Sequence, residues 1–219
     1  MIPIALQILN LLAAVLLLLT FAMLSQRRIL SLIHIFTLHG ATLVAAALVV
    51  AYITHDTHLY ISAALTFVLK VVLIPWILHK LIRRLNVKWD VEPLINVPAT
   101  MLIGIVLVII AFNLALPVAR LSSSVAHGTL GIALACILLS FMMMITRSKA
   151  VPQVIGFLSM ENGLFFAATA ATSGMPMIVE LGVALSVLGG ILIMGVFMFQ
   201  IREQFENMDI HNLETLKDE

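Results

Sequence analysis

The sequence predicts an all-α polytopic membrane protein with seven transmembrane helices, and three observations support this fold class. Apolar residues make up 62% of the 219 positions and charged residues 11%, whereas soluble domains contain about 45–50% and about 25%. The apolar residues gather in runs of the roughly 20 positions that a helix needs to cross a bilayer. Within these runs, as at 13–19, polar and apolar residues do not alternate, which excludes the strands of a lipid-facing β-barrel.

Seven runs satisfy this length requirement, and prolines mark their borders. The runs are 3–24, 30–53, 59–80, 97–118, 126–146, 151–173 and 177–201. At or just outside their ends, where a missing N–H costs least, lie Pro3, Pro93, Pro98, Pro117, Pro152 and Pro176. The connections between runs are short except the one from 79 to 97.

Taken in order, the runs divide the chain into three parts. The first run has no basic segment before it and is longer than the apolar core of a signal peptide, so we expect a retained span. With the next three runs it forms an N-terminal part of four helices, 1–125. Runs five to seven form a three-helix part, 126–201, and 202–219 is a polar tail. No soluble domain is expected.

Basic residues predict the orientation in the membrane, because short cytoplasmic connections are rich in Lys and Arg. In a seven-span topology one side carries Arg27, Arg28, Lys80, Arg83, Arg84, Lys88, Arg147, Lys149, Arg202 and Lys217. Only Arg120 falls on the other side. The N-terminus is therefore expected outside and the C-terminus in the cytoplasm.

The composition excludes several classes of function. The formal net charge is +1, so nothing favours nucleic-acid binding. Cys136 is the single cysteine, which excludes an internal disulfide, a Cys-ligated iron–sulfur cluster and a Cys-rich metal site. The chain also has no dinucleotide fingerprint. We therefore expect no cofactor, no metal, and a membrane subunit that is not itself an enzyme.

Lys70 is a candidate functional residue because it lies near the middle of 59–80, where an ionisable group costs about 2.5–3.5 kcal/mol on insertion scales. Ser62 and Thr66 share its helical stripe. Pro75 cannot donate to the carbonyl of residue 71, so a kink is expected beside Lys70. One interpretation is gating or proton transfer. The other is an ion pair, with Glu161 or an acid of an adjacent subunit, that only joins two helices.

Glu161 is the second candidate and lies at a similar depth in 151–173, directly before Asn162. Large apolar residues surround it at helical spacing. A carboxyl group in such surroundings is a candidate to accept and release a proton near neutral pH. The alternative is a permanently protonated donor to the next helix.

The other polar residues within the runs are weaker candidates. His34 and His39 are five positions apart and so about 140° apart around a helix, which is wrong for two ligands of one metal. Each belongs either to a proton path or to the core as a neutral histidine. Gln7, Asn10 and Asn113 are expected to make interhelical hydrogen bonds.

The last run, 177–201, carries one acid and a stripe of small residues. Glu180 lies near the outer end of the run, where ionisation costs little, and is the weakest candidate for a proton path. Gly182, Ser186 and Gly190 follow at four-residue spacing. This spacing is typical of close helix packing.

Two blocks of sequence carry a resemblance to a known family. The first comprises His127-Gly128, the segment Gly156-Phe157-Leu158-Ser159-Met160-Glu161-Asn162-Gly163 and the tail Asn207-Met208-Asp209-Ile210-His211-Asn212-Leu213. This block resembles the three-helix NuoK-type subunit of respiratory complex I and the MrpC subunit of Mrp antiporters. The second block is Phe67-Val68-Leu69-Lys70-Val71-Val72-Leu73-Ile74-Pro75. With it, the whole chain is similar to component E of the hydrogenase-4 type complexes, relatives of formate hydrogenlyase.

The resemblance implies a membrane-arm subunit of an energy-converting NiFe hydrogenase or a related complex. The implied partners are large antiporter-like membrane subunits, a complex I-like membrane anchor subunit, and peripheral NiFe hydrogenase and iron–sulfur subunits. In NuoK-like subunits a mid-membrane glutamate belongs to the proton path, and Glu161 occupies its position by motif. A second acid would fall between Ser186 and Gly190, where none is present. This departure argues against a complete relay through two carboxylates.

The expected function is proton or Na⁺ translocation, driven by redox chemistry in partner subunits, in the cytoplasmic (inner) membrane of a bacterium or archaeon. Three alternatives stay open. A non-conducting spacer that links antiporter-like subunits would explain the missing acid. A standalone transporter is less consistent with an odd number of helices. A retinal protein is opposed by the place of Lys70 in the third helix and by an aromatic content of 7%.

Overall fold

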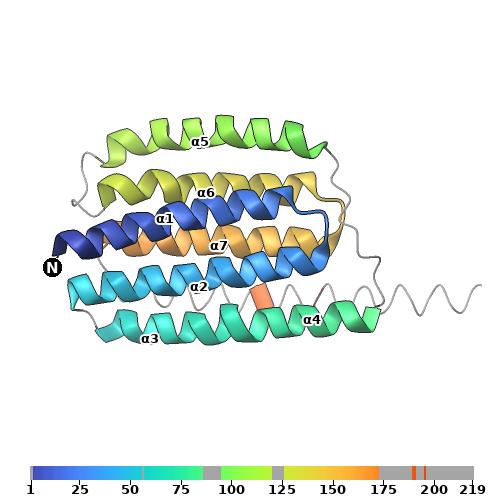
Figure 1. Cartoon of the computed structure of the whole chain (residues 1–219), viewed down its shortest axis with the longest axis horizontal. Helices are drawn as coiled ribbons and strands as arrows, with labels where there is room; N and C mark the ends of the chain where they lie inside the picture. The colour runs from blue at the N-terminus through green and yellow to red at the C-terminus, as the bar shows by residue number, and fades with distance from the viewer. Residues whose placement is uncertain are drawn as a thin grey trace, which may run out of the picture.

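The computed structural model describes residues 2–55, 57–85, 95–119 and 126–172, together with Gly189, Gly190 and Gly195. This part of the chain is all-helical and contains no strand. Its elements are α1 (Ile2–Ser25), α2 (Ile29–Thr54), α3 (Thr57–Thr66), the π-helical segment η1 (Phe67–Leu73), α4 (Ile74–Leu85), α5 (Val97–Ala119), α6 (Ala126–Thr146) and α7 (Ala150–Thr172). Figure 1 shows α3 and α4 as one rod, because η1 joins them without a break.

The elements match the first six predicted runs and extend one of them. The run 59–80 becomes the rod Thr57–Leu85, which continues into the connection expected from residue 79 onward. Basic residues near a helix C-terminus are favoured by the helix dipole, which explains why the rod outlasts its apolar run. Pro117 lies inside the last turns of α5 and not at its border.

Five of the helical stretches are long and apolar enough to cross a membrane, judged by length and composition. They are Ile4–Ser25, Ile29–Thr54, Thr57–Lys80, Val97–Pro117 and Thr129–Thr146. The predicted seventh run, 177–201, lies outside the described residues except for Gly189, Gly190 and Gly195, which are helical. Helix α7, which matches the predicted run 151–173, is not among the five stretches. The sixth and seventh spans therefore stay predictions.

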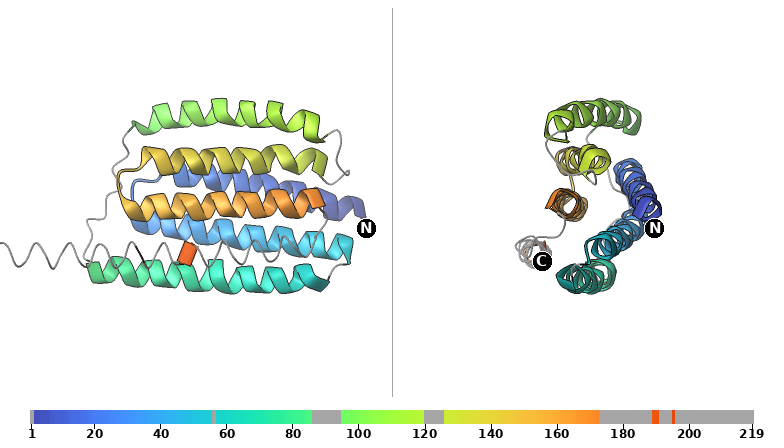
Figure 2. Two further views of the ribbon diagram at one scale, coloured as in Figure 1. Left: turned by 180° about the vertical axis from the view of Figure 1, so that it is seen from behind. Right: turned by 90° about the vertical axis from the view of Figure 1, so that its left-hand side faces the viewer.

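Two helical hairpins form the centre of the bundle. Viewed along the helices in Figure 2, α1 and α2 lie beside α6 and α7. Helix α1 packs against α6, and α2 packs against α7. The rod α3–η1–α4 covers the outer side of α2, and α5 covers α6. Large apolar side chains on these outer helices, such as Phe67 and Ile109, are exposed, as expected for surfaces in contact with lipid.

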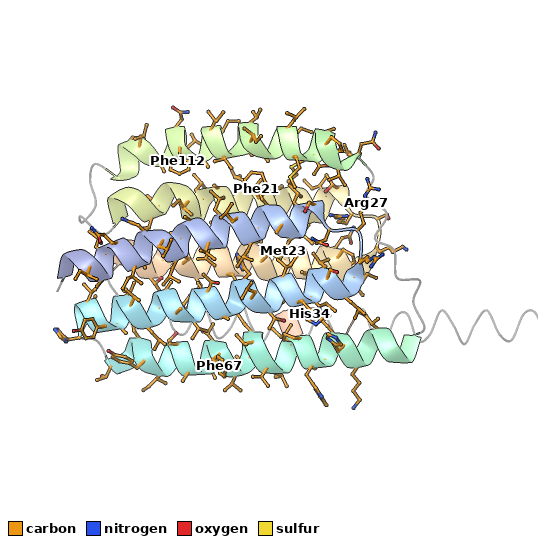
Figure 3. All side chains as sticks on the ribbon, in the orientation of Figure 1. Phe21, Met23, Arg27, His34, Phe67 and Phe112 are labelled. Carbon is orange, nitrogen blue, oxygen red and sulfur yellow. The ribbon has the colours of Figure 1, made fainter. Side chains whose placement is uncertain are left out.

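The buried apolar side chains form two separate clusters along the bundle. The basic-side cluster lies toward the α1–α2 connection, where Figure 3 shows Arg27 at the end of the bundle. It contains Met23, Leu24, Ile29, Leu32, Ile33, Phe36, Ile74, Leu78, Ile82, Leu139, Met142, Met143, Val151, Val154, Ile155 and Leu158. The opposite cluster contains Leu9, Ala13, Leu16, Leu43, Val44, Ala46, Ala47, Val50, Ala51, Leu59, Ala63, Ala133, Cys136, Phe165 and Phe166.

A layer of buried polar side chains separates the two clusters. On α2, His39 lies between Phe36 of one cluster and Leu43 of the other. On α7, Glu161 lies between Leu158 and Phe165 in the same way. The layer, which we call the polar layer, consists of Thr20, His39, Lys70, Ser140, Ser159, Glu161 and Asn162. These residues are spread over five elements but lie at one depth.

Candidate functional site

The π-helical segment η1 places Lys70 against α2. In a π-helix the N–H of residue i+5 donates a hydrogen bond to the carbonyl of residue i. Here the N–H of Ile74 donates to the Leu69 carbonyl. Pro75 has no N–H for the Lys70 carbonyl in that register, which explains why the π-helix ends there. The sequence predicted that Pro75 would leave the carbonyl of residue 71 unpaired. In the π-helical register, the carbonyl that lacks an N–H donor because of Pro75 is that of Lys70 instead.

Helix α2 contacts η1 at Gly40. A Cβ added to Gly40 would lie 3.5 Å from the Lys70 carbonyl oxygen and 3.6 Å from the Lys70 Cβ. The side chain of Lys70 then extends across α2 toward α7. Its exposed fraction is 1%, so the ammonium group lies wholly inside the protein.

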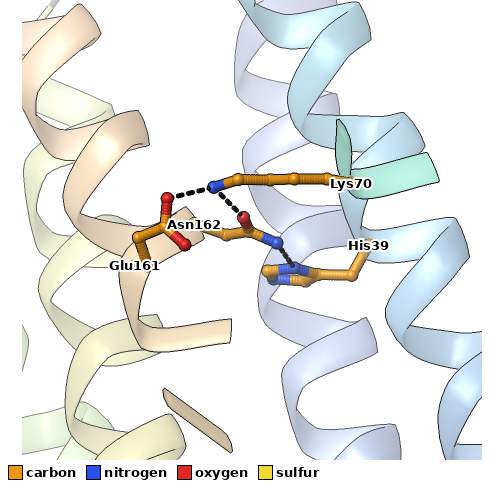
Figure 4. Close-up of polar contacts among 4 residues, drawn as sticks. All are labelled: His39, Lys70, Glu161 and Asn162. Atoms are coloured by element: carbon orange, nitrogen blue, oxygen red, sulfur yellow. Dashed lines mark hydrogen bonds and ion pairs between the residues drawn. The ribbon is translucent and has the colours of Figure 1, made fainter. Parts of the chain in front are cut away.

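Lys70 forms an ion pair with Glu161 and a hydrogen bond with Asn162, as Figure 4 shows. The Lys70 Nζ lies 2.8 Å from Glu161 Oε1 and donates to Asn162 Oδ1 at 2.7 Å. The ring of Phe165 is on the same side, with its centroid 6.0 Å from Nζ. Two consecutive residues of α7 therefore hold one ammonium group.

Asn162 extends the network to α2 and α1. Its Nδ2 lies 3.1 Å from His39 Nδ1. On the other side of the ring, His39 Nε2 lies 3.2 Å from Thr20 Oγ1. Thr20 donates its own hydroxyl proton to the Leu16 carbonyl at 2.8 Å, and the Cys136 thiol lies beside it. Four elements thus supply one continuous set of hydrogen bonds.

Close packing of α6 on α7 fixes the position of the acid and the amide. A Cβ added to Gly163 would lie 2.9 Å from Ile137 Cγ1 and 3.2 Å from the Ile137 backbone nitrogen. Next to this contact, Ser140 and Ser159 share a hydrogen bond of 2.8 Å between their hydroxyl groups. Glycine and serine are the residues that allow transmembrane helices to approach closely.

The pair of Lys70 and Glu161 is suited to proton transfer. Taking two charges out of water is costly, and the cost is offset only when further hydrogen bonds accompany the pair. Asn162 supplies one of these bonds to Lys70. A Lys–carboxylate contact of 2.8 Å is also a single hydrogen bond, across which a proton can pass without large movement of either side chain.

The structure brings together three of the predicted site residues and separates others. Lys70, Glu161 and His39 meet in the polar layer, and Glu161 is one of the two partners expected for Lys70. His34 lies outside it, exposed on α2, with its ring 5.4 Å from that of His79 on α4. The interpretation of His34 as a core histidine is therefore wrong.

Some polar residues lie outside the polar layer. Asn113 donates to the Ile109 carbonyl of its own helix and is exposed, so the interhelical bond expected for it stays a prediction. Gln7 and Asn10 are exposed on α1. An exposed amide on a helix can satisfy one donor with the carbonyl four residues earlier in its own helix.

The described part of the last run adds one contact to the site. Gly189 is buried, and a Cβ added to it would meet Leu158 and lie 4.0 Å from Glu161 Oε2. At Gly190 an added Cβ meets nothing within 4 Å. Position 189 is thus where a side chain of this run would reach Glu161. Glu180, Gly182 and Ser186 lie outside the described residues.

Sequence reasoning missed the roles of Asn162 and Thr20. Both are ordinary polar residues that a helix can satisfy alone, as Thr20 does in part through Leu16. One signal was present: Asn162 stands between an acid and Gly163, at the face where α7 approaches another helix. Thr20 had no comparable signal.

Comparison with known proteins gives one family and one more distant relationship. The chain is 30% identical to the Mycobacterium tuberculosis protein Rv0085 over 194 residues, which cover 88% of each protein. It is 24% identical to hydrogenase-4 component E of Escherichia coli K12 over 159 residues, covering 73% of this chain and 74% of that protein. Hydrogenase-4 component E of Shigella flexneri matches to the same extent.

No protein-family model matches the chain, and no solved structure matches it significantly. The match to Rv0085 covers 88% of the chain. Together with its apolar helices, these relationships identify a multi-pass membrane protein. The chain belongs to the same family as Rv0085 and is a distant homologue of hydrogenase-4 component E.

Proposed function

We propose that this protein is a membrane-arm subunit of an energy-converting hydrogenase-like, complex I-related complex, and that the Lys70–Glu161 pair takes part in proton translocation. The homology to hydrogenase-4 component E supports membership in such a complex. The observation that carries the proton role is the ion pair itself, buried between two apolar clusters. Charged groups at this depth are retained at a cost, and they mark ion paths in membrane proteins.

The proposed topology has seven spans, with the N-terminus outside and the C-terminus in the cytoplasm of a bacterium or archaeon. The connections α1–α2 and α6–α7, which carry Arg27, Arg28, Arg147 and Lys149, lie at the same end of the bundle in Figure 1. This common end supports the cytoplasmic assignment. We further propose a four-helix part, 1–125, and a NuoK-like part, 126–201.

The pair would join these two parts. Lys70 belongs to the first and Glu161 to the second. A proton transferred from Lys70 to Glu161 leaves both groups neutral, and the neutral pair can separate at much lower cost than an ion pair. The oxygen atoms of Glu161 and Asn162, which could otherwise bind a hard cation such as Na⁺, are both in contact with the Lys70 ammonium group, so the proton is the ion that we propose. The redox chemistry belongs to peripheral NiFe hydrogenase and iron–sulfur subunits, and this subunit is not itself catalytic. Its membrane partners are large antiporter-like subunits and a complex I-like anchor subunit.

The test is reductant-driven proton uptake in vesicles that contain equal amounts of assembled wild-type or variant complex. The variant Lys70→Met/Glu161→Gln removes both titratable groups together, which avoids leaving one buried charge alone. We expect uptake per electron to fall at least about tenfold while electron transfer continues. The control Ser140→Ala/Ser159→Ala removes a neutral buried pair at the same depth and is expected to leave uptake unchanged.

A non-conducting spacer between antiporter-like subunits is the second candidate. The apolar clusters on both sides of the polar layer favour it, since they separate the pair from either face in the described part of the chain. Unchanged uptake in the double variant would establish the spacer and refute translocation through this pair. A chain that is fully folded and monodisperse without partners would instead support a standalone transporter.

A further inference from the structure

Asn162 stands between two basic side chains and offers each a different end of one carboxamide. Its Oδ1 accepts from Lys70 Nζ at 2.7 Å, and its Nδ2 lies 3.1 Å from His39 Nδ1. The exposed fraction of Asn162 is 1%, so no bulk water competes for either contact. An amide has one accepting end and one donating end, which makes the contact directional.

The direction of every hydrogen in this network follows from the partners. An ammonium group can only donate, so the oxygen of Asn162 must face Lys70 and its NH₂ must face His39. His39 Nδ1 is then an acceptor and carries no proton. The Thr20 hydroxyl donates to Leu16, so it accepts from His39 Nε2. While Lys70 is charged, His39 is therefore neutral with its proton on Nε2.

The reverse arrangement requires the amide to turn. A proton on His39 Nδ1 would point at the NH₂ group of Asn162, and two facing donors are unfavourable in a buried site. Rotation of the carboxamide presents Oδ1 to His39 and NH₂ to Lys70. Lys70 can accept that hydrogen only as a neutral amine. A charged Lys70 and a proton on His39 Nδ1 thus need opposite orientations of Asn162.

We propose that Asn162 is a positioning residue that makes the charged form of Lys70 and protonation of His39 Nδ1 mutually exclusive, through rotation of its amide. The inference deepens the proposed function and rests on it. In the first step a Lys70 N–H bond breaks, the electron pair stays on Nζ, and Glu161 Oε1 gains the proton. Asn162 then turns, and the lone pair of His39 Nδ1 takes a proton from a hydronium ion of the translocation path, which is left as neutral water.

The surroundings of His39 support this coupling. Among the described residues, the ionisable groups that meet there are Lys70 from η1, Glu161 from α7 and the Cys136 thiol from α6, beside Thr20. An amide does not itself pass on a proton as a hydroxyl or imidazole does. Asn162 therefore separates Lys70 from His39 as proton carriers while linking their states. This prevents two cations from being held in the polar layer together.

The state of His39 can be read by ¹⁵N NMR of histidine-labelled chain within the assembled complex, with the His39 signals assigned by comparison with His39→Gln. In wild type we expect a neutral ring with Nδ1 unprotonated. The charge exchange Lys70→Glu/Glu161→Lys keeps an ion pair but makes position 70 an acceptor, so Asn162 must turn. The Nδ1 resonance should then move to the protonated region.

The same exchange combined with Asn162→Leu removes the amide and should return Nδ1 to its unprotonated position. An Nδ1 signal that does not move on the exchange, or that moves equally with Leu at 162, would overturn the proposal. If the exchanged chain does not assemble, Asn162→Asp supplies a second test. An aspartate accepts on both sides, so His39 Nδ1 should be protonated beside a charged Lys70, and an unprotonated Nδ1 there overturns the proposal too.

This readout separates the inference from the proposed function. Loss of proton uptake in the Lys70→Met/Glu161→Gln complex, with an unresponsive His39, would refute the switch and leave translocation standing. Unchanged uptake with a responsive His39 would refute translocation through the pair. In that case the amide would still link the two groups.

Discussion

The hairpins α1–α2 and α6–α7 can be compared position by position at an offset of 120 residues. In each, a hydroxyl on the first helix meets a polar side chain 19 residues later: Thr20 meets His39, and Ser140 meets Ser159. Both hairpins run in the same direction along the bundle in Figure 1. The shared spacing indicates one structural plan used twice.

The two hairpins differ in where they are closely packed and where they carry ionisable groups. The second is tight within itself, because Gly156 and Gly163 face α6, and its internal bond joins two neutral hydroxyls. In the first, Gly40 faces η1 instead of α1. The Lys70–Glu161 ion pair lies between η1 and α7, whereas the internal bond of the first hairpin includes one ionisable side chain, His39. The closest helix packing therefore lies within the second hairpin, whereas the ion pair lies between separate elements.

The largest expected effect comes from breaking the contact between elements. Lys70→Met leaves Glu161 as a buried charge without its cation, so the free energy of unfolding should fall by about 3–5 kcal/mol. Lys70→Met/Glu161→Gln should recover most of that loss. The measurement is the midpoint of thermal unfolding of the purified complex in lipid nanodiscs. Equal midpoints for the single and double variants would show that the pair is not energetically coupled.

A smaller effect compares how closely two helix contacts are packed, using a glycine-to-alanine substitution at each. In Gly163→Ala the new Cβ meets the Ile137 backbone at 3.2 Å, so a loss of about 1–3 kcal/mol is expected. In Gly40→Ala its neighbours are 3.5 Å or more away, and the higher helix propensity of Ala should add up to about 1 kcal/mol. The same unfolding assay compares them. A reversed order would mean that α6 and α7 are not the tighter pair.

The smallest effect concerns the two arginines at equivalent turns. Arg147 is buried and its Nη2 donates to the Leu24 carbonyl at 2.6 Å, while Arg27 is exposed. Arg147→Ala should lose about 1–2 kcal/mol with that charged hydrogen bond, and Arg27→Ala less than about 0.5 kcal/mol. Abundance of assembled complex after mild heating distinguishes them. Equal losses would remove this difference between the hairpins.

Much of the fold could be predicted from the sequence because apolar runs and prolines report directly on membrane spans. The run 126–146 coincides with α6, and 97–118 differs from α5 by one residue. The extension of the third run to Leu85 could not be read from hydropathy, since helix propagation beyond the bilayer depends on backbone bonding and charge and not on apolar residues.

The site was predictable only in part. Lys70 and Glu161 could be found because a charge at mid-span is rare. The π-helix around Lys70 was not predictable, since a single internal proline is equally compatible with a kink. Asn162 depends on contacts from η1 and α2 that are distant in sequence. No local pattern reports which of several polar residues will complete such a network.

The polar layer has an electrical consequence. Because it lies between apolar clusters of similar extent, a proton that reaches it from either face crosses about half of the transmembrane voltage. One charge moved across the whole membrane corresponds to about 2.3 kcal/mol per 100 mV, so half corresponds to about 1.2 kcal/mol. Proton occupancy of the layer would therefore change about sevenfold per 100 mV. An energised membrane would set the charge of the layer as directly as the pH on either side.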